Sequence, residues 1–162
     1  MPRPFRLARV TEDERVKAED RIAITDLVAR YADAVNANDA AEWGATWADE
    51  CTWEPSTGRV LHGRGEIVAF WKTAMASFES VLQVVGHGHA SEAGDGAVGS
   101  WTLFEVNRRD GANGIVLGHY RDRYARAQGR WLFAERRFTV TYRGSLPDGG
   151  FSGFRPRAGT GQ

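Results

Sequence analysis

The spacing of apolar residues changes once along this chain, from a helical period to a strand period. Apolar side chains recur at every third or fourth position between residues 16 and 36, which predicts one amphipathic helix ending near Asn36. The TEDE motif at residues 11–14 matches a capping box before that helix. A second apolar stripe predicts a helix from Gly65 to Phe78. Trp43 and Trp47 are four residues apart and predict a short helix between the two.

After residue 80 the period falls to two. Four segments follow one another at this spacing: VLQVVGHGHA (81–90), AVGSWTLFEV (97–106), GIVLGHYRDRYARA (114–127) and RWLFAERRFTVTYRG (130–144). RDGANG and AQG between them are typical of hairpin turns, so neighbouring strands are expected to be antiparallel. CTWEP (51–55) predicts one further short strand. The pattern predicts an α+β fold, in which a cone-shaped, curved antiparallel sheet wraps around the N-terminal helix and leaves a pocket at its open end. Two further short helices complete it.

Length and composition fit one folded domain. The 162 residues are 42% hydrophobic and include six tryptophans. We place the domain at residues 11–145, between an N-terminal arm (1–10) and a Gly- and Pro-rich tail (146–162). Because 21 basic residues balance 21 acidic ones, no nucleic-acid partner is expected. No run approaches the roughly 20 apolar residues of a membrane helix, and a single cysteine without a secretory leader predicts a cytoplasmic protein.

Three stretches of the chain together resemble a known family. They are YADAVNANDAAEWGATWADECTWEP (31–55), GRGEIVAFW (63–71) and GHYRDRYARAQGRWLFAERRFTVTY (118–142), within a resemblance that spans roughly residues 15–145. Their order and spacing are similar to those of the SnoaL-like branch of the nuclear transport factor two-like superfamily, which includes scytalone dehydratase, bile-acid dehydratase, polyketide cyclases and hexachlorocyclohexane dehydrochlorinase. The resemblance implies the α+β cone, a homodimer or homotrimer, and cofactor-free proton abstraction or elimination on a hydrophobic small molecule.

The same resemblance draws attention to individual positions. In the dehydratases and the dehydrochlorinase, an Asp at the end of the first helix orients a His on the first long strand, and that His removes a proton. These positions carry Asn36 and Gln83 here, which keep a hydrogen-bonding shape but take up no proton near neutral pH. Trp101 stands where some dehydratases have a second histidine. Tyr31 matches an assisting tyrosine of some dehydratases, and Arg136 matches an arginine that binds the leaving group in the dehydrochlorinase.

His87 and His89 lie in the LQVVGHGHA stretch. Strand alternation predicts that both point to one face, the face of Gln83, with Cα atoms roughly 6.5–7 Å apart. Three interpretations are open. In the first, one histidine lies in the pocket wall and the other at the strand end. In the second, His87 is a relocated general base, and in the third both histidines bind a metal. A metal would need a further ligand and groups that orient the rings. We assign no metal to the protein.

Alternation also places Asp122 on the inward face of its strand, together with Tyr120 and Tyr124. An inward Asp needs a cation, and Arg136 on the next predicted strand is the obvious partner. Such a pair either pins two strands together or acts in the site, with Arg136 binding an oxyanion while Asp122 orients it or serves as a base. Tyr31 is similarly open, as a core residue or a catalytic acid.

These interpretations predict a cofactor-independent lyase, isomerase or cyclase that acts on a hydrophobic aromatic or polyketide-like small molecule. The candidate catalytic residues are Tyr31, His87, Asp122 and Arg136. The candidate ligand-binding residues are Asn36, Trp53, Gln83, Trp101 and Tyr120. The alternative is a non-catalytic small-molecule-binding protein on the same fold, from which the acid–base dyad has been lost.

Overall fold

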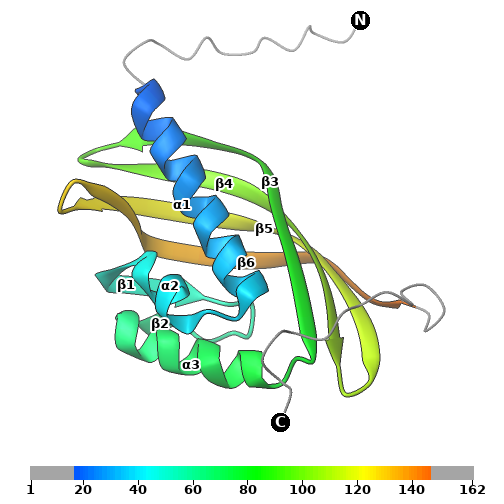
Figure 1. Cartoon of the computed structure of the whole chain (residues 1–162). Coiled ribbons are helices and arrows are strands. Elements are labelled where there is room, and N and C mark those ends of the chain that lie inside the picture. The colour runs from blue at the N-terminus through cyan, green and yellow to red at the C-terminus, as the bar shows by residue number, and fades with distance from the viewer. Residues whose placement is uncertain (1–16, 147–162) are drawn as a thin grey trace, which may run out of the picture.

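A long helix packs against the concave face of a curved sheet in the computed structural model, which describes residues 17–146 (Figure 1). This helix, α1 (Ala18–Ala37), buries one apolar stripe that includes Ile24, Leu27 and Val28. It ends where Asn38 adopts a left-handed conformation and its N–H bonds back to the last turn, close to the predicted end near Asn36. The capping box at 11–14, the arm at 1–10 and residues 147–162 of the tail lie outside the described residues.

Two short elements follow α1 and correct one prediction. α2 (Ala40–Ala45) starts at Asp39, whose side chain accepts hydrogen bonds from two first-turn amides at 3.0 Å. The helix ends at Thr46. The Thr46 carbonyl accepts a hydrogen bond from the Phe133 amide at 3.0 Å, which connects the end of the helix to the sheet. The predicted short helix with Trp43 is confirmed, but Trp47 begins strand β1 (Trp47–Glu54), so the extension of that helix to Trp47 is wrong. The two indoles still pack, with centroids 5.5 Å apart.

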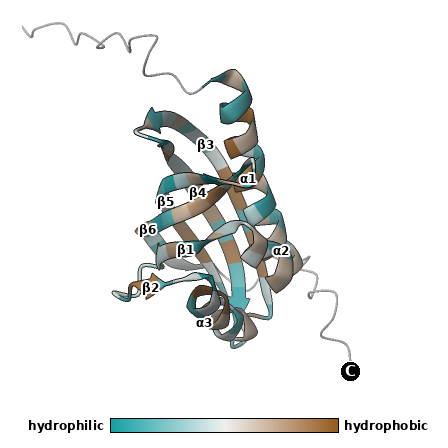
Figure 2. Ribbon diagram, turned by 90° about the vertical axis from the view of Figure 1, so that its left-hand side faces the viewer, coloured by the Kyte–Doolittle hydropathy of each residue, from teal (hydrophilic) through white to brown (hydrophobic). Residues whose placement is uncertain are grey.

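The four long strands are confirmed as an antiparallel meander. They are β3 (Ser80–Ala93), β4 (Gly96–Arg109), β5 (Ala112–Ala127) and β6 (Arg130–Leu146), in a six-stranded sheet of order β2-β1-β6-β5-β4-β3. The β4–β5 and β5–β6 turns are Asp110–Gly111 and Gln128–Gly129, all with positive φ, as type I′ hairpins require. Polar and apolar residues follow one another along these strands (Figure 2).

The sheet is not antiparallel throughout. β1 pairs antiparallel with β2 (Leu61–His62) but parallel with β6. α3 (Arg64–Ala76) then crosses from β2 to β3 and covers the open end of the curved sheet (Figure 1). The sequence predicted a fully antiparallel sheet, and this is wrong at the β1–β6 junction. These are the first and last strands along the described chain.

Aromatic side chains fill the core between the helices and β1. Trp43 stacks on Trp71 of α3 with centroids 4.7 Å apart and an interplanar angle of 15°, and it also contacts Trp47 and Trp53. This cluster joins α2, α3 and β1 into one hydrophobic unit. None of the described helices combines the length and the apolar character needed to cross a bilayer.

Cys51 lies in this core, and burial raises the pKa of its thiol from 9.0 to about 11. The folded thiol thus stays protonated at pH values where the unfolded thiol ionises. Its contribution to stability is complete below pH 9 and is lost between pH 9 and about 11, with a slope of at most about 1.4 kcal/mol per pH unit. We expect urea unfolding at pH 8, 9 and 10 to show this decline in the native protein and to lack it in Cys51→Ala. Equal declines in both proteins would contradict the assignment.

Candidate functional site

A cavity of about 580 Å³ lies between α1, α3 and the concave face of the sheet, and we call it the aromatic cavity. Its volume suits a small organic molecule. Aromatic residues dominate its wall: Tyr31, Trp53, Phe70, Trp71, Phe78, Tyr120 and Phe138. Gln83, Glu105, Arg109 and Arg143 supply polar or charged groups. An aromatic wall with few polar groups favours a hydrophobic ligand that is oriented by a small number of hydrogen bonds.

Asn36 and Gln83 are in contact, but the contact joins the side chain of Asn36 to the main chain of Gln83. The Asn36 side chain donates to the Gln83 carbonyl at 3.0 Å and accepts from the Gln83 amide at 2.7 Å. It therefore clamps the end of α1 to the main chain of β3. Asn36 itself does not line the aromatic cavity, whereas Gln83 does. Only the carboxamide has both the donor and the acceptor that this clamp uses.

This clamp predicts the effect of Asn36→Asp. A carboxylate would lose the donor and face the Gln83 carbonyl oxygen, so the free energy of unfolding should fall by about 1–2 kcal/mol. Urea unfolding at neutral pH measures the change. Asp33→Asn, at an exposed position of the same helix, is the control and should change stability by less than about 0.5 kcal/mol. A stable Asn36→Asp protein would show that the position tolerates a carboxylate.

Glu105 brings a carboxylate into the aromatic cavity. Gln83 Nε2 donates to its Oε2 at 2.8 Å, and Asn107 Nδ2 donates to its Oε1 at 2.7 Å. Both donors are neutral, and no arginine or lysine forms an ion pair with Glu105 among residues 17–146. No motif or resemblance pointed to Glu105. The available signal was alternation, which puts an acidic residue on the same inward face as Trp101 and Leu103.

Tyr31 and Tyr120 line the cavity and are almost completely buried. Burial raises the pKa of both hydroxyls, and the effect on Tyr120 is large. The nearby Arg136 opposes this rise in each tyrosine, while the Glu105 charge adds to it in Tyr120. Both hydroxyls are therefore neutral at physiological pH. They are suited to donate a hydrogen bond and unsuited to act as bases.

Asp122 and Arg136 form the predicted inward ion pair. Arg136 Nε and Nη2 donate to the two Asp122 oxygens, each at 2.8 Å, and both side chains are fully buried. Tyr124 donates to Asp122 Oδ2 at 2.7 Å, and Trp101 Nε1 donates to the Tyr124 hydroxyl at 2.7 Å. Burial alone would lower the pKa of Arg136, but the Asp122 carboxylate raises it by more, so the net shift is upward and the guanidinium stays charged.

The ion pair lies behind the cavity wall. The Arg136 guanidinium carbon is 3.8 Å from the ring centroid of Tyr120 and 4.3 Å from that of Tyr31. Neither member of the pair lines the aromatic cavity. Among the predicted ligand-binding aromatics, Trp53 and Tyr120 do line it, whereas Trp101 does not.

The HGH stretch is bulged. Gly86 pairs with Thr102 and Gly88 with Trp101, which leaves His87 as an extra residue with a φ of 37°. A side chain at position 88 is excluded, because a Cβ there would lie 2.0 Å from the Trp101 ring. The bulge interrupts the predicted alternation at His87, and it places His89, which pairs with Ser100, on the face opposite to Gln83, so the prediction that both histidines share the face of Gln83 is wrong.

Both histidines are exposed, and neither lines the aromatic cavity. Within the described part of the chain, no group of three or more His, Cys, Asp or Glu residues is arranged to hold a metal ion.

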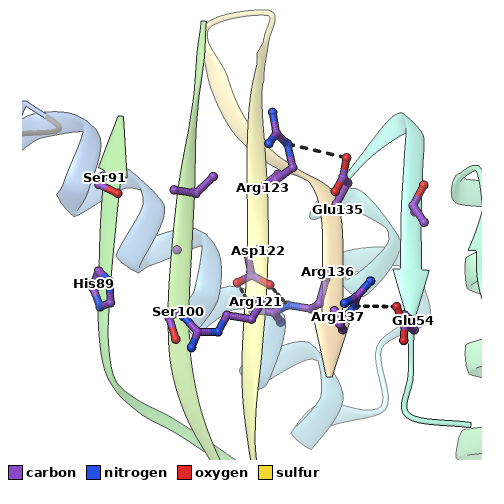
Figure 3. A pocket seen from close by; sticks show the side chains of 13 residues that line it. Glu54, His89, Ser91, Ser100, Arg121, Asp122, Arg123, Glu135, Arg136 and Arg137 are labelled. Carbon is purple, nitrogen blue, oxygen red and sulfur yellow. Dashed lines mark hydrogen bonds and ion pairs between the residues drawn. The ribbon is translucent and has the colours of Figure 1, made fainter. Parts of the chain in front are cut away.

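A second hollow, of about 370 Å³, lies on the opposite face of the sheet (Figure 3). His89, Ser100 and Arg121 line it, together with the residues of three ion pairs, one of which is the buried Asp122–Arg136 pair. Arg137 bonds to Glu54 at 2.6 Å, and Arg123 lies 3.7 Å from Glu135. Its charges are largely balanced within the wall, and among the described residues that line it there is no Phe, Tyr or Trp. The aromatic cavity is therefore the better candidate for a hydrophobic molecule.

Comparisons with known proteins agree with this geometry. Residues 16–137 match the SnoaL-like domain family. A type 2 hexachlorocyclohexane dehydrochlorinase is similar with a TM-score of 0.75 and 15% identity over 80% of this chain and 90% of that chain. A type 3 enzyme from Novosphingobium barchaimii has a TM-score of 0.72 and 15% sequence identity, over 80% of this chain and 92% of that chain. A scytalone dehydratase-like protein from Novosphingobium aromaticivorans has a TM-score of 0.72 and 17% sequence identity, over 87% of this chain and 93% of that chain. At these identities the likeness shows the shared fold. No protein with a curated function matches by sequence.

Proposed function

Because the chain belongs to the SnoaL-like domain family, we propose that it is a cofactor-independent lyase, isomerase or cyclase acting on a hydrophobic aromatic or polyketide-like molecule. The observation that carries this proposal is the Glu105 carboxylate, which is held by Gln83 and Asn107 within a cavity of aromatic side chains. A carboxylate oriented by neutral donors in such a place is suited to take a proton from carbon.

The proposed reaction begins with transfer of a proton from a carbon next to a carbonyl group to Glu105. The C–H bonding electrons form a carbon–carbon double bond, the carbonyl π electrons move to the oxygen, and an enolate results. Tyr31, kept neutral by its raised pKa, donates a hydrogen bond to that oxygen, and Tyr120 supports it by donating to the Tyr31 hydroxyl. Arg136 stabilises the developing negative charge from behind their rings. The enolate then re-forms the carbonyl while it expels a leaving group from the β carbon, attacks a second carbonyl, or, where it is conjugated, takes up a proton at the far carbon of the conjugated system. Glu105 returns its proton to the leaving group, to the new alkoxide or to that carbon. Asp122 keeps Arg136 in place, and His87 takes no part.

A non-catalytic binding protein is the second candidate. No histidine lines the aromatic cavity, and Asn36 is engaged by the main chain of β3. On this alternative, Gln83 and Glu105 hydrogen-bond a ligand that leaves chemically unchanged. The two candidates differ in whether a bound molecule exchanges its carbon-bound protons with solvent.

Proton exchange in heavy water tests the proposal. The protein is incubated with a panel of aromatic and polyketide-like ketones, including β-hydroxy ketones, and deuterium uptake and water loss are measured by mass spectrometry. We expect exchange or elimination on at least one member, and its loss in Ala74→Phe, which fills the cavity. Ala76→Phe, at an exposed position of α3 outside the cavity lining, is the matched control and should retain activity. Binding of a panel member without any exchange or elimination would favour the binding protein.

A further inference from the structure

Two guanidinium groups at the aromatic cavity lack a strong ionic partner among residues 17–146. Arg109, the last residue of β4, lies 3.8 Å from Asp110, whose side chain is 94% exposed. Its guanidinium carbon is 5.5 Å from the ring centroid of Phe78, a residue of the cavity wall. Arg143 of β6 lines the same cavity and makes no hydrogen bond or ion pair with the described residues. Both arginines therefore have N–H groups available to a ligand.

The sheet register fixes where Arg143 lies relative to the proposed base. Gln83 pairs with Glu105, Glu105 with Val116, and Val116 with Arg143, so all four occupy one row across the sheet. Glu105 and Arg143 are two strands apart in that row, which corresponds to roughly 10 Å between their main chains. Val116 lies between them, also in the cavity wall. The negative charge and the positive charge thus occupy opposite sides of an apolar stretch.

We infer that the substrate carries a carboxylate on its aromatic or polyketide-like body. This inference rests on the proposed function and names its substrate class. Arg143 and Arg109 bind the carboxylate, because a guanidinium matches its geometry with two parallel hydrogen bonds. The apolar body lies against Val116 and the aromatic wall, and the acidic carbon reaches Glu105. A substrate bound the other way round would place its anion beside the Glu105 carboxylate, which like-charge repulsion disfavours.

The test compares 2-naphthoate with its neutral isostere 2-naphthamide by isothermal titration calorimetry at low salt. The native protein is expected to bind 2-naphthoate on the order of tenfold more tightly. Arg143→Gln and Arg109→Gln should each reduce this preference, and the double variant should abolish it without weakening 2-naphthamide. Arg121→Gln is the matched control, because Arg121 is an exposed arginine that lines the hollow on the opposite face of the sheet. It should leave the preference unchanged.

The outcomes separate this inference from the proposed function. Equal affinity for the two probes, both lost in Ala74→Phe, would overturn the carboxylate inference and leave the cavity as the ligand site. A preference that survives in the double arginine variant would also overturn it. If the preference depends on both arginines while Glu105→Gln retains full turnover, the assignment of the base fails and the substrate class stands. If neither probe binds the native protein, both the inference and the cavity assignment fail.

Discussion

Asp122→Asn is expected to lower the free energy of unfolding by about 3–5 kcal/mol. The exchange leaves the Arg136 guanidinium charged, fully buried and without a counter-charge, since Asp122 is its only ion-pair partner among the described residues. Tyr124 loses a charged acceptor at the same time. Urea unfolding monitored by tryptophan fluorescence measures the effect.

Two further proteins make this result interpretable. Glu54→Gln removes one carboxylate from the exposed Arg137–Glu54 pair and should cost less than about 1 kcal/mol. The double exchange Asp122→Leu with Arg136→Met removes both charges and should recover much of the stability lost in Asp122→Asn. If Asp122→Asn cost no more than Glu54→Gln, the buried pair would not be the stabilising element described here.

Glu105→Gln is expected to reduce turnover of a substrate found in the exchange assay by about 10²–10⁴-fold, because the amide cannot accept a proton. Affinity should change little, since the two side chains have nearly the same shape. Gln83 can reorient to accept from the new amide, because its Oε1 has no hydrogen-bond partner in the described structure. Single-turnover rates and calorimetric affinities separate the two effects.

Glu135→Gln is the control for this exchange. Glu135 is an exposed carboxylate on β6, two strands away from β4, and lies on the opposite face of the sheet, so its loss should leave turnover unchanged. If Glu105→Gln and Glu135→Gln were equally active, the proton would be taken by another group, and the proposed scheme would be wrong.

Local sequence signals predicted most of the fold. The apolar periods located α1, α3 and the four long strands, and the Asp-Gly and Gln-Gly turns gave the hairpins, because each depends on residues close together in sequence. Alternation also placed Asp122 inward and found its partner Arg136. The parallel β1–β6 pairing was missed, since nothing local in either strand specifies a partner so distant along the chain.

The site was harder to predict than the fold. The extra residue in β3 is His87 itself, which breaks the alternation that had placed both histidines in the pocket, and the local pattern does not show that Trp101 packs where a side chain at position 88 would lie. Asn36 was expected to contact a ligand, yet it bonds to the main chain of β3. Glu105 was visible as an acidic residue at an inward position, but only the bonds from Gln83 and Asn107 show how it is held.

The parallel pairing of β1 with β6 has a consequence for how the chain acquires its structure. Near the start of the domain, β1 carries Trp47 and Trp53 of the core, but β6, one of its two neighbours in the sheet, is the last of the described strands to be synthesised. Pairing across such a sequence separation is slow, because loop closure must precede the contacts that stabilise it. A nascent chain would therefore expose its tryptophan-rich first half until β6 leaves the ribosome, and during that interval it is prone to aggregate.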